Sequence, residues 1–228
     1  MEIKGSVALV TGANRGIGHA FARALVERGA AKVYAGVRDP AQVTDEDLTA
    51  LRLDVTQPDE VAAAAAAASD VTIVVNNAGV GGFGTELLTG SFDDARQAME
   101  TNYFGTWAVS RAFAPVLARN GGGALVNMLS VASWFSRLDY PGYAASKAAQ
   151  WSLTGALRHG LREQGTLVVA VHAGFVETEL SSFTDAPKIS AADVAEQTLD
   201  ALADDRAEVL ADDWTRQVKQ ALSQPVER

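Results

Sequence analysis

Val7-Ala8-Leu9-Val10 leads directly into Thr11-Gly12-Ala13-Asn14-Arg15-Gly16-Ile17-Gly18 near the start of this chain. The first four residues are apolar throughout, as in a strand covered on both faces of a parallel sheet. The glycines that follow can take positive φ angles and let the backbone approach a ligand closely. An alanine-rich helix comes next, and its N-terminus offers unpaired N–H groups and a positive dipole end to a phosphate. A glycine-rich turn can be merely a tight connection, but one between a strand and a helix is typical of dinucleotide binding.

Apolar runs alternate with amphipathic helical stretches along the rest of the chain, which is the pattern of βαβ units and a parallel sheet. We therefore expect a single α/β domain over residues 1–228, with a doubly wound parallel sheet and helices on both faces. The expected strands, about seven, are Val7–Val10, Lys32–Gly36, Thr49–Asp54, Val71–Asn76, Gly123–Leu129, Leu167–His172 and Glu208–Ala211. The expected helices are Gly16–Glu27, Pro58–Ala68, Phe92–Arg119, Tyr143–Glu163, Ala191–Asp204 and Trp214–Leu222.

The composition excludes several classes of protein. The formal net charge of −9 argues against a nucleic-acid or anionic-membrane surface. No apolar run approaches the ~18 residues of a membrane span, and the N-terminus lacks the features of a signal peptide, so we expect a cytoplasmic protein. There is no cysteine, and the three histidines lie far apart without metal-binding spacing. We therefore expect no metal.

Tyr143 and Lys147 stand four positions apart in Tyr-Ala-Ala-Ser-Lys, within an expected helix. Residues at i and i+4 share one helix face, so the phenol and the ammonium can point into one site. A neighbouring cation favours the phenolate and lowers the pKa of a tyrosine, which makes it a usable general acid–base. The alternative is a helix with one packed ring and one solvated charge.

The spacing of Thr11-Gly-x-x-x-Gly-Ile-Gly18 resembles the cofactor motif of the short-chain dehydrogenase/reductase family. Asn76-Asn77-Ala78-Gly79 is similar to the motif that follows the family's fourth strand. The family's catalytic tetrad is matched in order and spacing by Asn102, Ser130, Tyr143 and Lys147. The resemblance covers nearly the full chain, and it implies a Rossmann fold and an NAD(P)-dependent oxidoreductase.

The resemblance also implies a role for each tetrad residue. Tyr143 would donate a proton to a carbonyl oxygen in reduction and accept it in oxidation. Lys147 would lower the pKa of Tyr143 and hold the nicotinamide ribose. Ser130 would hydrogen-bond the substrate oxygen, and Asn102 would kink its helix and anchor a water that links Lys147 to solvent.

The choice of cofactor depends on the end of the second strand, where a carboxylate binds a ribose 2′-OH and an arginine accommodates a 2′-phosphate. By the resemblance, Val37 stands where NAD-using relatives carry aspartate, and Arg38 and Arg15 are basic, so we expect NADP(H) rather than NAD(H). In the competing view Arg38 pairs with Asp39, and Asp39 lies near the ribose. The residues expected to hold the cofactor are Gly12, Asn14, Arg15, Gly16, Ile17, Gly18, Arg38, Asp54, Val55, Asn76, Ala78, Gly79, Tyr143, Lys147, Gly174, Val176 and Thr178.

The loop after the sixth expected strand departs from the family pattern in two ways. Ala173 stands before Gly174 where relatives usually have proline, and only Glu179–Ile189 separates this loop from the next helix. The short segment suggests an open pocket, and its aromatic residues suit an apolar or aromatic ketone or aldehyde, although plain loop packing would also explain them. The expected pocket residues are Phe83, Val131, Trp134, Phe135, Leu138, Phe175, Leu180 and Phe183.

The expected partners are a small carbonyl or alcohol substrate and further copies of the chain. In much of the family the two long helices form a dimer interface, so we expect a homodimer or a homotetramer. A non-catalytic dinucleotide-binding regulator is an alternative, but such proteins often lose the tyrosine or the lysine. An epimerase or dehydratase would usually need an extended substrate domain, for which this chain has no room. An NAD-dependent alcohol dehydrogenase stays open as a variant of the leading hypothesis.

Overall fold

A seven-stranded parallel sheet forms the middle layer of the protein, whose structure is a computed structural model that describes residues 1–81, 87–89, 91–136 and 138–224. The strand order is β3-β2-β1-β4-β5-β6-β7. The strands are β1 Val7–Thr11, β2 Lys32–Val37, β3 Thr49–Arg52, β4 Ile73–Asn76, β5 Ala124–Met128, β6 Leu167–His172 and β7 Glu208–Leu210. The order reverses between β1 and β4, and the carboxyl ends of the strands on either side of that switch point are where such sheets bind ligands.

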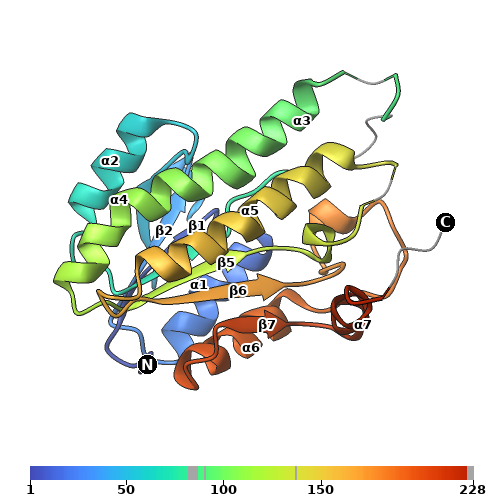
Figure 1. Cartoon of the computed structure of the whole chain (residues 1–228). Helices are drawn as coiled ribbons and strands as arrows, with labels where there is room; N and C mark the ends of the chain where they lie inside the picture. Colours follow the sequence, from blue (N-terminus) through green and yellow to red (C-terminus); the bar gives the residue numbers. More distant parts are fainter. Residues whose placement is uncertain (82–86, 90, 137, 225–228) are drawn as a thin grey trace.

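Helices cover both faces of this sheet (Figure 1), with α4 and α5 side by side over one face and α1 and α6 packed together on the other. The α-helices are α1 Gly16–Glu27, α2 Pro58–Ala67, α3 Asp93–Ala98, α4 Thr106–Arg119, α5 Pro141–Gly160, α6 Ala191–Ala203 and α7 Asp213–Ala221. Short 3₁₀ turns lie at Pro40–Gln42, Val131–Ser133 and Glu179–Ser181. The predicted single α/β domain with about seven parallel strands is confirmed.

Each face of the sheet has its own hydrophobic core, because successive side chains of a strand point to opposite faces. Val10 of β1 packs into the core beneath α1 and α6, which includes Phe21 and Leu199. Leu9, its neighbour in β1, packs into the core beneath α2 and α4, which includes Phe113. All five side chains are fully buried, and burying a residue of this size stabilises a fold by about 1.5–3 kcal/mol.

The long helix predicted over Phe92–Arg119 is continuous but changes its winding. A π-helical segment, Met99–Gly105, separates α3 from α4. Gly105 at its end approaches β3's following loop so closely that a Cβ would lie 2.6 Å from Cγ2 of Val55. Single π-helical turns inside α-helices are frequent at functional sites. Here the segment carries Asn102, which is fully buried.

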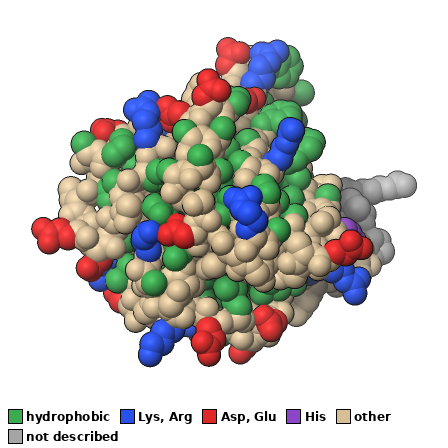
Figure 2. All heavy atoms as spheres, turned by 90° about the vertical axis from the view of Figure 1, so that its left-hand side faces the viewer, with side chains coloured by type: hydrophobic (Ala, Val, Ile, Leu, Met, Phe, Trp, Pro, Cys, Tyr) green, Lys and Arg blue, Asp and Glu red, His purple; other side chains and the backbone are tan. Residues whose placement is uncertain are grey.

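The surface gives two further observations. Among the described residues, no helix is both long enough and apolar enough to span a bilayer. On the face that Figure 2 presents, acidic and basic side chains are interspersed.

Candidate active site

A cavity of about 1260 Å³ opens at the carboxyl ends of the central strands. The turn after β1, the loops after β2, β4 and β6, and the start of α5 all contribute to its walls. Of the residues predicted to hold a cofactor, its lining contains Gly12, Asn14, Arg15, Gly16, Ile17, Arg38, Asp54, Val55, Ala78, Gly79, Tyr143, Lys147, Gly174, Val176 and Thr178.

Two residues predicted to contact the cofactor do not line the cavity. Gly18 faces the turn instead, since a Cβ there would lie 2.2 Å from the carbonyl oxygen of Gly12. Asn76 is 2% exposed at the end of β4 and donates through Nδ2 to Asn127 Oδ1 at 2.9 Å and to Ser110 Oγ at 3.0 Å. The predicted contacts of these two residues with the cofactor stay predictions. Asn76 holds β4, β5 and α4 together.

The turn after β1 has the geometry of an anion cradle. Gly12 and Gly16 take φ angles of 68° and 56°, a region that L side chains rarely adopt. A Cβ on Gly12 would lie 3.2 Å from Cα of Ala78, and one on Gly16 would lie 3.3 Å from Cγ2 of Thr178. No side chain caps the start of α1, and its first turn contains no acidic residue. The free N–H groups therefore fit a pyrophosphate, and the predicted phosphate turn suits the group it is expected to bind.

The charged residues near β2 favour a 2′-phosphate over a ribose hydroxyl. Arg38 lies exposed at the cavity edge, directly after the buried Val37. Asp39, which also lines the cavity, caps the following 3₁₀ turn, where its Oδ1 accepts from the Ala41 N–H at 3.1 Å. Arg15 reaches across the cavity mouth and forms an ion pair with Glu179. A phosphate at this position would compete with Glu179 for the Arg15 guanidinium.

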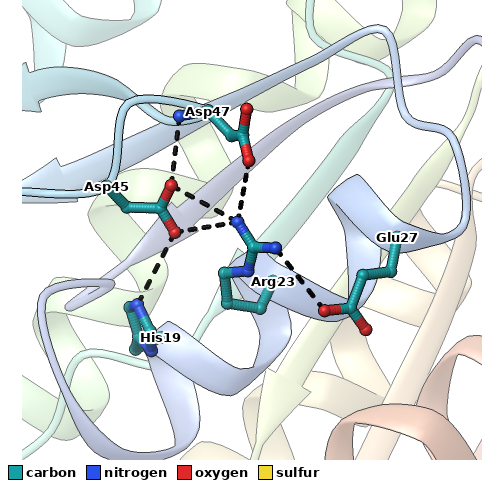
Figure 3. Close-up of polar contacts among 5 residues, drawn as sticks. All are labelled: His19, Arg23, Glu27, Asp45 and Asp47. Atoms are coloured by element: carbon teal, nitrogen blue, oxygen red, sulfur yellow. Dashed lines mark hydrogen bonds and ion pairs between the residues drawn. The ribbon is translucent and has the colours of Figure 1, made fainter.

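An ion-pair cluster holds the segment after this 3₁₀ turn against α1 (Figure 3). Arg23 contacts Asp45 at 3.0 Å, Asp47 at 2.9 Å and Glu27 at 3.6 Å, and His19 approaches Asp45 at 3.9 Å. The backbone N–H of Asp47 and the Arg23 guanidinium lower the pKa of Asp45. The cluster fixes the loop that begins with Gln42.

Gln42 is the residue that this loop brings to the cavity. Its Oε1 accepts a hydrogen bond from Asn14 Nδ2 at 2.8 Å. The loop after β2 and the glycine turn after β1 are thereby joined beside Arg38. The turn is also joined to the loop after β4, because Thr11 Oγ1 accepts from the backbone N–H groups of Asn77 at 3.0 Å and Ala78 at 2.9 Å.

Ser130 and Tyr143 meet on the cavity wall as the sequence predicts. Ser130 follows β5 directly, and its side chain forms a hydrogen bond with that of Tyr143. Ser130 Oγ also accepts from the Ala132 N–H at 3.1 Å, which fixes the hydroxyl at the start of the 3₁₀ turn Val131–Ser133. The phenol of Tyr143 is therefore positioned by Ser130 and presented to the cavity.

Lys147 lies beneath the tyrosine. Its Nζ donates to the Met128 carbonyl at 2.8 Å and to Gln150 Oε1 at 2.9 Å, and lies 5.9 Å from the centre of the Tyr143 ring. Gln150 in turn donates to Thr106 Oγ1 at 2.8 Å. The ammonium thus belongs to a buried polar line that connects α5 to α4.

The predicted lowering of the Tyr143 pKa by Lys147 is wrong for this arrangement. Burial raises the pKa of Tyr143, and the hydrogen bond with Ser130 opposes that rise. Burial also lowers the pKa of Lys147 from 10.5 to about 7, so the lysine is only partly cationic at neutral pH. The side chains that shift the pKa of the phenol here are Ser130, which lowers it, and Tyr140, which raises it, while the lysine amine bonds Met128 and Gln150.

Asn102 does not line the cavity, but it fixes a wall of it. Its side chain donates to Ser146 Oγ at 2.9 Å and to the Val80 carbonyl at 3.0 Å, and accepts from the Val80 N–H at 2.9 Å. Ser146 belongs to α5, one position before Lys147. Asn102 therefore joins the loop after β4 to the helix that carries Tyr143 and Lys147.

The predicted substrate pocket is brought together in part. The residues that line the cavity are Val131, Phe175, Leu180 and Phe183. Trp134 and Leu138 instead line a second cavity of about 590 Å³, and Phe135 packs its ring edge against Trp214 at 6.1 Å. These three residues do not line the first cavity, and their assignment to the substrate pocket stays a prediction. Phe83 lies outside the described residues.

Asn77, Tyr140 and Trp214 are among the cavity residues that the sequence analysis did not predict. The sequence could have predicted Asn77 as a cavity residue, because Asn76 ends a strand and the residue after it enters the loop. Tyr140 was set aside since no lysine follows it by four positions, yet it is 5% exposed and packs its ring edge on Tyr143 at 6.2 Å. Nothing local in the sequence places Trp214 at the site, because α7 reaches it only through the tertiary fold.

Histidine and carboxylate side chains do not form a metal site in the described part of the chain. His172 at the end of β6 is buried and stacks on Trp134 with ring centres 3.9 Å apart, and burial lowers its pKa to about 4. It is a packing residue. The described part of the chain contains no group of three or more His, Asp or Glu side chains that could hold a metal ion.

The chain matches the model of the short chain dehydrogenase family over residues 6–188. It is 32% identical over 190 residues to the 3-oxoacyl-[acyl-carrier-protein] reductase FabG of Vibrio cholerae, which covers 79% of this chain and 78% of the relative. A short chain dehydrogenase from Burkholderia cenocepacia, solved in complex with NADP, superimposes with a TM-score of 0.94 at 37% identity over 98% of this chain and 95% of that one. A family member from Burkholderia phymatum, solved in complex with NAD, superimposes with a TM-score of 0.86 at 27% identity over the whole of both chains. With the glycine cradle and the Ser130–Tyr143 pair, these matches show that the chain belongs to the short-chain dehydrogenase family.

Proposed function

We propose that this protein is an NADPH-dependent oxidoreductase that reversibly reduces a ketone or aldehyde carbonyl to an alcohol. The observation that carries the proposal is the hydrogen-bonded pair of Ser130 and Tyr143 on the wall of a cavity that also contains a glycine cradle for phosphate. The family match supports the reaction class, and the name of the Vibrio cholerae relative, a 3-oxoacyl reductase, supports reduction of a carbonyl.

In this proposal the chain has two tasks, to orient the carbonyl and to supply one proton. Because its pKa is raised, Tyr143 stays protonated at neutral pH and donates its phenolic proton to the carbonyl oxygen. Ser130 offers a hydroxyl to the same oxygen as negative charge develops there. The bound nicotinamide supplies the hydride that goes to the carbonyl carbon. In the reverse direction Tyr143 accepts the proton of the alcohol.

The remaining tetrad members are proposed to act around this pair. Lys147 holds its amine between Met128 and Gln150, from where it can reach the nicotinamide ribose once the cofactor is bound. Asn102 keeps the loop after β4 and α5 in register, which is a positioning role. The regulatory alternative has less support, because a protein that only bound a dinucleotide would not need Ser130 and Tyr143 in hydrogen-bond contact.

NADP(H) is the cofactor that the charges support. The 2′-phosphate would meet a basic site at the end of β2, because Arg38 follows the neutral Val37 there. The carboxylate of Asp39 caps the following 3₁₀ turn. The NADP complex of the similar Burkholderia cenocepacia protein agrees with this choice. The less similar Burkholderia phymatum protein was solved with NAD, so NADH is the cofactor against which NADPH should be compared in experiments.

We also propose that copies of this chain associate through α4 and α5, which run side by side (Figure 1). Phe104, Trp107 and Trp151 are 46%, 45% and 43% exposed on these helices and the π-helical segment before them. Large aromatic side chains gathered on an exposed face are typical of an association surface. The oligomer, whether dimer or tetramer, and a cytoplasmic location stay predictions.

The proposal is tested by purified protein, NADPH and a panel of ketones and aldehydes. Tyr143→Phe removes the proton donor, so we expect kcat for reduction to fall by about 10²–10⁴-fold while NADPH binding persists. Tyr103→Phe, which removes a hydroxyl outside the cavity, is the matched control. Full activity in Tyr143→Phe would exclude this mechanism.

A second arm of the same experiment addresses the cofactor. Arg38→Ala should raise the KM for NADPH by about 10–100-fold, the value of a charge-assisted hydrogen bond, and leave the KM for NADH unchanged. Arg119→Ala, at the exposed end of α4, is the matched control. An unchanged KM for NADPH would leave the choice of NADPH without a basis.

A further inference from the structure

The last described helix places a tryptophan in the cavity. Trp214, the second residue of α7, lines the same cavity as Ser130 and Tyr143. Its ring lies 5.4 Å from that of Phe175, with the two planes inclined by 30°. Phe183 meets Phe175 edge-on at 5.9 Å. Three aromatic rings from two distant parts of the chain therefore form one wall, which we call the aromatic wall.

Trp214 is held firmly in this position. Asp212 caps α7 by accepting from the Thr215 N–H at 2.8 Å, and its other oxygen accepts from the Gly174 N–H at 2.6 Å. Gly174 passes so close beneath the indole that a Cβ would lie 2.7 Å from Cε3 of Trp214. The indole thus rests on the backbone of the loop after β6, and its orientation does not depend on a ligand.

The same cavity contains the reacting groups. A carbonyl oxygen that meets Tyr143 and Ser130 therefore places the substrate in the cavity that the aromatic wall lines. Tyr140 adds a further ring there, edge-on to Tyr143 at 6.2 Å. Glu179 is paired with Arg15 at the cavity mouth, but the acidic Glu177 also lines the cavity and disfavours an anionic substrate body.

We propose that Trp214 determines substrate specificity, and that with Phe175 and Phe183 it selects a neutral carbonyl compound whose body is a flat, apolar ring system. The proposal rests on the reductase function inferred above and deepens it. Offset-stacked and edge-on contacts between rings are favourable beyond simple burial, and a flexible aliphatic chain cannot make them. A rigid ring also loses less conformational entropy on binding than a chain of equal size.

The test compares a ring ketone, 1-tetralone, with a chain ketone, 2-octanone. Trp214→Leu keeps an apolar side chain over Gly174 but removes the ring, whereas Trp214→Phe keeps a ring. We expect the ratio of kcat/KM for 1-tetralone over 2-octanone to fall about tenfold in Trp214→Leu and to stay within about threefold of wild type in Trp214→Phe. Leu222→Ala, at the far end of the same helix, is the matched control and should leave the ratio unchanged.

The proposal is overturned if Trp214→Leu leaves the ratio unchanged or lowers it only as much as Trp214→Phe. Binding of the two ketones to the NADPH-loaded protein, measured by calorimetry, separates this outcome from failure of the reductase function. If the wild type reduces no carbonyl but binds 1-tetralone about tenfold more tightly than Trp214→Leu does, the aromatic wall stands and the reductase function falls. Equal binding by both proteins overturns the role of Trp214 whatever the activity.

Discussion

At the residue scale, Lys147 is a lysine in a buried environment. Its side chain is 5% exposed, and its amine is bound by the neutral oxygens of Met128 and Gln150. Among the described residues, no carboxylate forms an ion pair with it. Burial therefore lowers its pKa to about 7. A buried, unpaired lysine is expensive for the fold, and its retention here points to a role in the site.

The lowered pKa predicts how stability depends on pH. Because the folded-state pKa of about 7 lies below the ordinary 10.5, the unfolded chain binds more protons between these values. The free energy of unfolding should therefore gain a contribution that rises with pH from about 7 to 10.5, at up to ~1.4 kcal/mol per pH unit. In Lys147→Met this contribution should be missing, which urea unfolding at a series of pH values can measure. Equal slopes in the two proteins would contradict the burial of the amine as a neutral base.

The sequence predicts which side chains meet in the site better than it predicts where each one points. The meeting of Ser130 and Tyr143 was predictable from the resemblance to the family's tetrad, which both residues match in order and spacing. The direction of the Lys147 amine was not, because it depends on Gln150 and on the carbonyl of Met128. The prediction also named Asn76 as a cavity residue where the structure has Asn77. A shift of one residue decides whether a side chain lies in the sheet or in the loop, and the sequence does not fix this.

At the element scale, α7 depends on a single carboxylate. Asp212 provides the N-cap through its contacts with the N–H and the hydroxyl of Thr215, and it also receives the Gly174 N–H. Asp212→Ala should lower the free energy of unfolding by about 1–2 kcal/mol, because a cap is lost and a backbone N–H loses its partner. Denaturant unfolding measures this loss. Asp213→Ala is the control, because its exposed pair with Arg216 is worth little, and an equal loss in both variants would refute the role of Asp212.

The elements themselves show what periodicity can and cannot predict. The helices and strands follow from alternating apolar runs, and their observed ends differ from prediction by a few residues. The π-helical segment Met99–Gly105 could not be predicted in detail, because the apolar pattern of Phe92–Arg119 continues through it. Its cause is tertiary, since Asn102 bonds Val80 and Ser146 and Gly105 is pressed against Val55.

At the scale of the whole molecule, the parallel sheet order follows from the regular alternation of strands and helices, which admits few topologies. The proposed association surface on α4 and α5 does not follow from that pattern. The family resemblance predicts it on the two long helices, and the structure adds that Phe104, Trp107 and Trp151 are exposed there.

The proposed association predicts a change in mass. Trp107→Glu places a charge in the centre of this surface, so the oligomer should dissociate toward the monomer of 23.9 kDa. Analytical ultracentrifugation measures the change directly. Leu88→Glu replaces a side chain that is 91% exposed outside α4 and α5, and should leave the mass unchanged. A monomeric wild type, or an intact oligomer in Trp107→Glu, would contradict the proposal.

The attachment of α7 has a consequence for how such a chain can evolve. In this proposal the glycine cradle, Arg38 and the Ser130–Tyr143 pair all precede Asp212 in the sequence, whereas the indole that faces the substrate follows it. Substitutions after Asp212 can therefore alter which compound is accepted without disturbing the groups proposed for hydride and proton transfer. A related enzyme could gain activity on a new compound through substitutions in the segment after Asp212 alone. A laboratory library confined to that segment would vary the accepted substrate without changing the groups proposed for hydride and proton transfer.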